Sequence, residues 1–183
     1  MTFSEAVKTV IRKTFVIQGR ASRSEYWWWL LFILIIYIAM AYIIPTMVLR
    51  AAHTTNQFIG LFAWFFGSAI AGFTFNLITI IPTTSVGIRR MHDIGKSGWW
   101  CLFDFIPRAF ALLSGLIFFS IIMGIKIDGI LNIMSPKTII NSTYLMYASH
   151  VVFWILCLFE SQPNENQYGE NPNALPNTEN TSE

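Results

Sequence analysis

The sequence VGIRRMHDIGKSGWW (Val86–Trp100) lies between two long apolar runs of this 183-residue chain. It ends in two tryptophans and concentrates charged and titratable side chains in a short space: Arg89, Arg90, His92, Asp93 and Lys96. A short charged segment between apolar runs and aromatic residues is typical of a loop at a membrane surface. The segment therefore predicts that the helices before and after it cross a membrane.

The composition of the whole chain supports this prediction. Hydrophobic residues make up 54% of the chain and charged residues 12%, whereas soluble domains contain about 25% charged residues. The excess apolar surface is expected to face a lipid bilayer. A net charge of +2 is too small to indicate nucleic acid as a partner. Cys101 and Cys157 lie inside apolar runs without a CxxC pair, so neither zinc nor a disulfide is indicated.

Four apolar runs predict an all-α, polytopic membrane protein with four transmembrane helices. A span needs about 20 apolar residues, and the predicted spans are residues 26–49, 58–82, 99–125 and 139–159. Pro45 is expected to kink or end the first helix, whereas Pro82 need not end the second, which can continue to Asp93. These spans place a transmembrane domain at residues 19–160.

Residues 1–18 are predicted to form an amphipathic helix in the plane of the headgroups. Thr2 and Glu5 have the spacing of a capping box, and apolar residues repeat at helical intervals opposite basic ones. The alternative is that this helix packs on protein. Because the N-terminus lacks the apolar core of a signal peptide, the first span is expected to act as the targeting signal. Residues 161–183, which contain no Lys or Arg, form an acidic tail that is expected to be disordered beyond Pro172.

The distribution of Lys and Arg predicts the orientation in the membrane. Eight of them flank the spans on one side, against three on the other, namely Arg50, Lys126 and Lys137. The positive-inside rule therefore places the N-terminus and the central loop in the cytoplasm. Four spans return the C-terminus to the same side.

Three stretches together resemble a known family: GRASRSEYWWWLLF (Gly19–Phe32), RRMHDIGKSGWW (Arg89–Trp100) and NENQYGENP (Asn164–Pro172). They are similar to the GR-x-x-R, RRLHD-x-x-x-SGWW and N-x-YG-x-x-P motifs of the bacterial inner-membrane proteins grouped as domain of unknown function 805. The resemblance implies a multi-pass protein of the bacterial inner membrane, without an established activity. Met91 replaces the usual leucine, and the stretch between Pro107 and the last run is longer than in the family pattern.

The basic residues of these motifs form the first candidate site. In the predicted topology one cytoplasmic cluster contains Arg20, Arg23, Arg89, Arg90 and Lys96. Arginine binds phosphate and carboxylate well, so the cluster is predicted to contact anionic phospholipid headgroups or the chain's own C-terminal tail. The supporting motif residues are His92, Asp93, Gly98, Trp99, Asn166, Tyr168 and Gly169. The alternative is that the charges only set the topology and pair internally, for example Arg89 with Asp93 four residues away.

Four polar residues at membrane depth form the second candidate site: Asn76, Asp104, Arg108 and His150. Asp104 and Arg108 are four residues apart and are expected to neutralise each other or to snorkel. Asn76 and His150 are expected to form hydrogen bonds with neighbouring helices. The competing interpretation is a path for a small solute through a homo-oligomer.

An enzyme is the least favoured function. The adjacent residues His92 and Asp93 point to different sides of a helix, and the chain contains no nucleophile elbow, P-loop or HExxH motif. His53, His92 and His150 are too dispersed to predict a metal site. The sequence thus predicts a membrane-embedded binding or scaffold module that uses no cofactor, with transport as the alternative.

Overall fold

The computed structural model describes residues 1–51, 57–122 and 136–174 of the chain. These residues form helices and no strand, apart from an isolated bridge between Asn166 and Gly169. The predicted all-α fold is confirmed. In chain order, the elements are α1 (Phe3–Arg12), α2 (Arg23–Ala51), α3 (Gln57–Asp93), the 3₁₀ helix η1 (Gly98–Cys101), α4 (Leu102–Ile122) and α6 (Pro136–Leu158).

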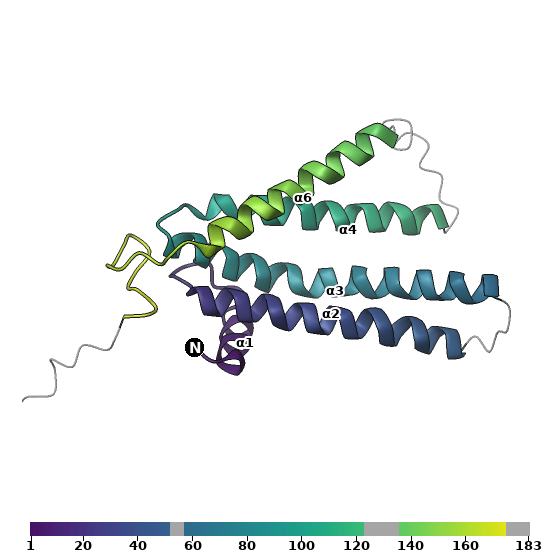
Figure 1. Cartoon of the computed structure of the whole chain (residues 1–183), viewed down its shortest axis with the longest axis horizontal. Helices are drawn as coiled ribbons and strands as arrows, with labels where there is room; N and C mark the ends of the chain where they lie inside the picture. Colours follow the sequence, from purple (N-terminus) through teal and green to yellow (C-terminus); the bar gives the residue numbers. More distant parts are fainter. Residues whose placement is uncertain (52–56, 123–135, 175–183) are drawn as a thin grey trace, which may run out of the picture.

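The long helices lie side by side and bring distant parts of the sequence to one end (Figure 1). α2 packs along α3, α3 contacts α4, and α6 packs on α4 near this end and diverges from it farther away. α1, the connection from α3 to η1 and the segment after α6 all lie at this end. We call it the motif end and define it as residues 19–25, 89–101 and 157–173.

The proline predictions are confirmed for Pro82 and corrected for Pro45. α3 continues through Pro82 to Asp93, as predicted. α2 also continues through Pro45 to Ala51, so the predicted alternative that this proline ends the helix is wrong. α3 approaches α2 closely at this proline, because a Cβ added to Gly67 of α3 would lie only 3.2 Å from Pro45 Cα. The last residues of the third predicted span, 123–125, lie outside the described residues.

The long helices expose apolar side chains to their surroundings. Ile38 and Tyr42 of α2 are 59% and 71% exposed, and Ile78 of α3 is 68% exposed. Of the helices in the described ranges, those at residues 23–50 and 58–93 are long and apolar enough to cross a membrane. α3 has 37 residues and is about 55 Å long, which exceeds the roughly 30 Å of a hydrocarbon core. Apolar surface of this extent indicates contact with lipid.

The buried core lies at the motif end rather than in the middle of the bundle. Its members come from α1, the α1–α2 connection, α2, α3, η1 and α6: Val10, Ala21, Tyr26, Trp29, Ile33, Val86, Met91, Cys101, Phe153 and Cys157. A hydrogen bond of 3.0 Å from Trp29 Nε1 to Thr83 Oγ1 joins α2 to α3 beside this core. The motif end is therefore the part of the protein with the most specific packing.

α1 packs on protein with one face and leaves the other exposed. The predicted capping box is confirmed, and its hydrogen bonds from Thr2 lower the pKa of the Glu5 carboxyl. Ala6 and Val10 are buried, and the hydroxyl of Ser85 donates to two carbonyl oxygens just after α1. The face of α1 that carries Ala6 and Val10 therefore packs on protein, which was the alternative to a position in the plane of the headgroups. The exposed face carries apolar as well as basic side chains.

Paired substitutions test whether close contact between α2 and α3 stabilises the bundle. We expect Gly67→Ala to lower the free energy of unfolding by about 1–3 kcal/mol relative to Gly72→Ala, because its new methyl group meets the backbone of Pro45. The Cβ added to Gly72 lies in ordinary contact, 3.9 Å from the ring of Tyr37. Thermal unfolding of the two purified variants in detergent measures the difference. Equal stability of the two variants would contradict the role of Gly67.

Candidate functional site

The carboxylate of Asp93 lies at the centre of the motif end. Asp93 is the last residue of α3, and its side chain is fully buried. Its Oδ1 accepts a hydrogen bond from Arg20 Nε at 2.9 Å, and its Oδ2 accepts from Arg90 Nη1 and from the hydroxyl of Ser161. The backbone carbonyl of Asp93 also accepts from the amide of Gln162 at 3.0 Å. This residue therefore joins the α1–α2 connection, α3 and the segment after α6.

Arg20 uses the rest of its guanidinium to hold the segment after α6. Nη1 donates to the carbonyl oxygens of Asn164 and Gly169 at 2.9 and 3.2 Å, and Nη2 donates to that of Gln162 at 2.5 Å. Arginine suits this role because it carries five N–H donors in a fixed planar arrangement. A lysine at this position would lack both the planar geometry and two of the donors.

Arg90 binds the end of α6. Its Nε donates to the carbonyl oxygen of Cys157 at 3.1 Å, and its Nη2 donates to that of Phe159. The last carbonyl groups of a helix have no partner within the helix, and a cation is favourable beside them. Arg90 therefore caps α6 while it also neutralises Asp93.

Arg89 pairs with a carboxylate that the predicted helical spacing did not select. Its Nη1 lies 2.6 Å from Glu25 Oε1, and both side chains are buried. The predicted pair of Arg89 with Asp93 is wrong, because Asp93 is already occupied by Arg20 and Arg90. Glu25 lies in the first turn of α2, where it is available to the face of α3 that carries Arg89.

His92 stacks on the tail through the ring of Tyr168. The ring centroids are 3.8 Å apart and the planes differ by 2°. Asn166 Nδ2 donates to the carbonyl oxygen of His92 at 3.0 Å, and two backbone hydrogen bonds between Asn166 and Gly169 close a tight turn. Gly169 has a φ of +120°, a conformation that favours glycine. The N-x-YG motif therefore forms the turn that docks on the end of α3.

Two residues of the central loop end one helix and begin the next. Gly95 adopts a φ of +75° after α3, and Ser97 caps η1. A Cβ on Gly98 would lie 2.9 Å from a side-chain carbon of Ile88, which explains the small residue at this position. Asp93, Arg20, Arg90 and Ser161 form what we call the Asp93 cluster. Trp99 is 76% exposed and takes no part in it. Lys96 also lies apart from it, with its Nζ 5.1 Å from the ring centre of Trp100.

The predicted cluster of five basic residues divides into a buried group and an accessible group. Arg20, Arg89 and Arg90 have side chains that are only 0–1% exposed, and their guanidinium groups face protein rather than headgroups. Arg23 has a half-exposed side chain, 3.6 Å from Glu160. Contact with headgroups is therefore open to Arg23 and Lys96, whereas the buried arginines are engaged internally.

Three of the four residues of the second predicted site form a smaller polar group. Arg108 Nε donates to Asp104 Oδ2 at 2.8 Å, so the predicted pairing of these residues is confirmed. His150 of α6 lies with its Nε2 3.3 Å from Asp104 Oδ1, which confirms the predicted contact with a neighbouring helix. Asn76 is different, because its Oδ1 is buried without a hydrogen-bond partner. The hydrogen bond expected between helices is therefore not made through that atom.

Two residues of the site were not predicted from the sequence. Ser161 and Gln162 follow α6 directly, and the only signal for them was that the chain becomes polar after the last apolar run. Within the described ranges, no group of three His, Cys, Asp or Glu residues is arranged to hold a metal ion. His53, and most of the tail that was expected to be disordered, lie outside those ranges.

Comparison with known proteins places this arrangement in a family. The family described as "Protein of unknown function (DUF805)" matches residues 14–170, which include the first two motifs and the third as far as Glu170. "Inner membrane protein YhaI" of Escherichia coli K12 is 27% identical over 99 residues, and "Inner membrane protein YhaH" of the same strain is 26% identical over 98. Each match covers 54% of this chain and 70% of the relative. No solved structure matches. With its apolar helices and these relatives, the chain is a membrane protein that belongs to the DUF805 family.

Proposed function

We propose that the chain is a four-span protein of the inner membrane whose N- and C-termini both face the cytoplasm. α4 and α6 have 21 and 23 residues and are therefore about 32 and 35 Å long, enough for a hydrocarbon core of about 30 Å. Eight Lys and Arg residues at one side of the spans, against three at the other, support the cytoplasmic position of the motif end. The exposed Trp99 at that end suits the membrane interface.

The function supported best is that of a scaffold or binding module that holds its own C-terminal segment. The observation that carries this proposal is the Asp93 cluster, in which Arg20 donates to three carbonyl oxygens of residues 162–169. A buried arginine with its donors occupied in this way serves to position a segment rather than to exchange a ligand. The docked segment then forms a fixed surface on the cytoplasmic side.

We assign contact with anionic phospholipid to residues other than the buried arginines. Lys8 and Arg12 lie on the exposed side of α1, and Arg23 is accessible nearby. In the proposed topology these side chains lie at the level of the headgroups, together with the exposed Phe3 and Phe15. α1 would then be an interfacial helix that is also fixed to the protein by its buried face.

Transport of a small solute is the alternative function. A cavity of about 380 Å³ is lined by Asn76, Ser68, Thr79 and Arg108, which supplies polar groups at membrane depth. Four spans form a narrow structure, so this function requires a homo-oligomer. Solute flux into proteoliposomes that is abolished by Asp104→Asn would favour transport over the scaffold.

The docking of the tail is tested by removal of its central carboxylate. We expect Asp93→Asn to increase the rate at which proteinase K, added to inverted membrane vesicles, cleaves the chain within residues 162–172, measured by mass spectrometry of the fragments, because Arg20 and Arg90 lose their shared partner. Removal of one member of a buried ion pair costs about 3–5 kcal/mol. Glu165→Gln changes an exposed carboxylate of the same segment and should leave the rate of cleavage unchanged. Wild-type resistance in the Asp93 variant would contradict the proposal.

A milder substitution separates docking of the tail from folding of the bundle. Gly169→Ala places a side chain at a φ of +120°, although an added Cβ has open space around it. Such backbone strain costs about 1–3 kcal/mol, so we expect faster cleavage of the tail with an unchanged melting temperature of the bundle. Glu170→Ala at the next, exposed position is the control. A loss of bundle stability equal to the effect on the tail would show that the two are not separable.

The number of spans is tested by a reporter fused after Glu183. We expect a reporter that is active only in the cytoplasm to be active, and a periplasmic reporter to be inactive, since four spans return the chain to its starting side. Cysteines introduced at Arg23 and Lys96 should be labelled from the same side. An active periplasmic reporter would indicate an odd number of spans and would remove the tail from the cytoplasmic face.

A further inference from the structure

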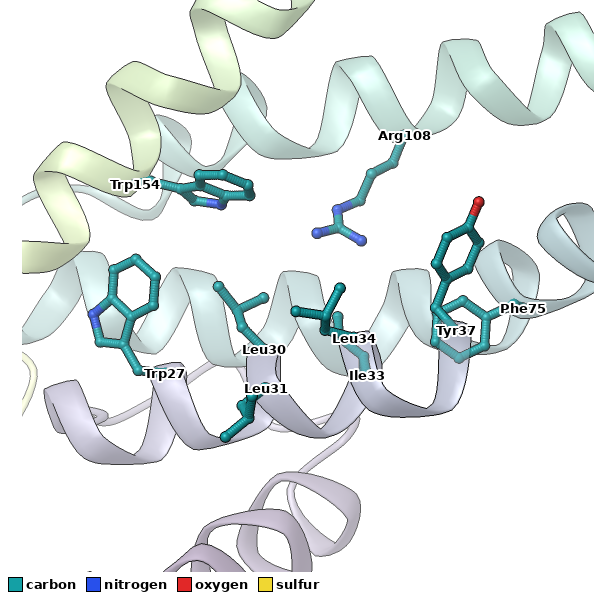
Figure 2. A pocket seen from close by; sticks show the side chains of 9 residues that line it. All are labelled: Trp27, Leu30, Leu31, Ile33, Leu34, Tyr37, Phe75, Arg108 and Trp154. Atoms are coloured by element: carbon teal, nitrogen blue, oxygen red, sulfur yellow. The ribbon is translucent and has the colours of Figure 1, made fainter. Parts of the chain in front are cut away.

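A cavity of about 410 Å³ lies between α2, α4 and α6, next to the motif end. Trp27, Leu30 and Leu34 line it from α2, Trp154 from α6, and Tyr37 farther along α2 (Figure 2). The distance from Trp27 to Tyr37 is ten residues, or about 15 Å along the helix, which is half the thickness of a hydrocarbon core. Leu34 and Trp154 are 52% and 40% exposed, so the cavity is accessible from the lipid-facing surface.

One charged side chain enters this apolar cavity. Figure 2 shows the guanidinium of Arg108 directed from α4 into the space between Trp154, Leu34 and Tyr37. Nε and Nη2 donate to Asp104 at 2.8 and 3.4 Å, whereas Nη1 makes no hydrogen bond with the described residues. The pair of Arg108 and Asp104 has no net charge, yet it offers unused N–H donors to the cavity.

The neutral ion pair and its unused donors indicate which kind of ligand fits the cavity. An anion would gain no net attraction from the neutral pair and would approach the carboxylate of Asp104, so a neutral hydrogen-bond acceptor fits better. The guanidinium is level with Leu34, seven residues beyond Trp27, or about 10 Å deeper. The ester groups of phospholipids lie at the edge of the hydrocarbon core, so the ligand must carry its acceptor farther in.

We propose that this cavity binds a lipophilic quinone, a neutral ring with carbonyl oxygens and an apolar tail. A carbonyl oxygen of the ring accepts a hydrogen bond from Arg108, and the ring packs against the aromatic walls at Trp154 and Trp27. The volume lies within the range of about 300–1,000 Å³ for ligand sites. The depth in this argument rests on the proposed position of the motif end at the membrane surface.

The test uses the purified full-length protein and its own tryptophan fluorescence. Decylubiquinone is titrated as the probe, and decylbenzene, which has the same tail but no carbonyl group, is the control ligand. We expect saturable quenching by decylubiquinone. We expect decylbenzene to compete with it, and so to reverse the quenching, only with an affinity at least tenfold weaker. Trp154→Phe should reduce the amplitude of quenching, because it removes a reporter from the wall of the cavity.

The second part of the test substitutes the hydrogen-bond donor, Arg108. Arg108→Lys keeps a positive charge for Asp104 but loses the Nη1 donors, and we expect it to weaken decylubiquinone binding about tenfold. Arg50→Lys, at an exposed arginine in the last turn of α2 and outside the cavity, should leave the affinity unchanged. If Arg108→Lys does not fold, Leu34→Trp, which fills the cavity from α2, should abolish saturable quenching instead.

Three results would overturn the proposal. They are equal affinity for decylubiquinone and decylbenzene, unchanged affinity in both cavity variants, and displacement of the quinone by oleate at lower concentration, which would indicate an anionic amphiphile. The reporter fusion and the protease assay involve no quinone. Failure of the proposed topology or of tail docking is therefore detected separately from failure of this site.

Discussion

The carboxylate of Asp93 is shared by two buried guanidinium groups, and the structure of the motif end depends on this sharing. Burial of an ion costs several kcal/mol unless its partners are complete. Arg20 and Arg90 obtain complete partners only because carbonyl oxygens of the end of α6 and of residues 162–169 surround them. The arginines hold the tail, and the tail in turn makes their burial possible. Neither the burial of the arginines nor the docking of the tail is favourable without the other.

This mutual dependence explains why specific packing is concentrated at one end of the molecule. The long helices expose apolar side chains along their length, and lipid can solvate these side chains. α2 and α3 approach closely where Gly67 faces Pro45, whereas α6 diverges from α4 away from the motif end (Figure 1). A bundle fixed at one end in this way has room for a cavity between its helices.

Predictions from local spacing were the most accurate. The capping box of Thr2 and Glu5 and the pair of Asp104 with Arg108 depend on neighbours within four residues, and the structure contains both. The pair of Arg89 with Asp93 had the same spacing and was wrong. There, Glu25 and Arg20 compete from 64 and 73 residues away, and helical spacing carries no information about such partners.

By itself, the sequence determined the class of the protein, its helices and its family, because apolar length, capping residues and motif order are properties of the chain alone. Only the tertiary structure decided which acceptors the arginines of the motif end bind and whether their charges are buried. A guanidinium is compatible with any carboxylate, phosphate or carbonyl oxygen within reach. The choice among them is made by the segments that folding brings within about 3 Å, and for Arg20 these segments include the end of the chain.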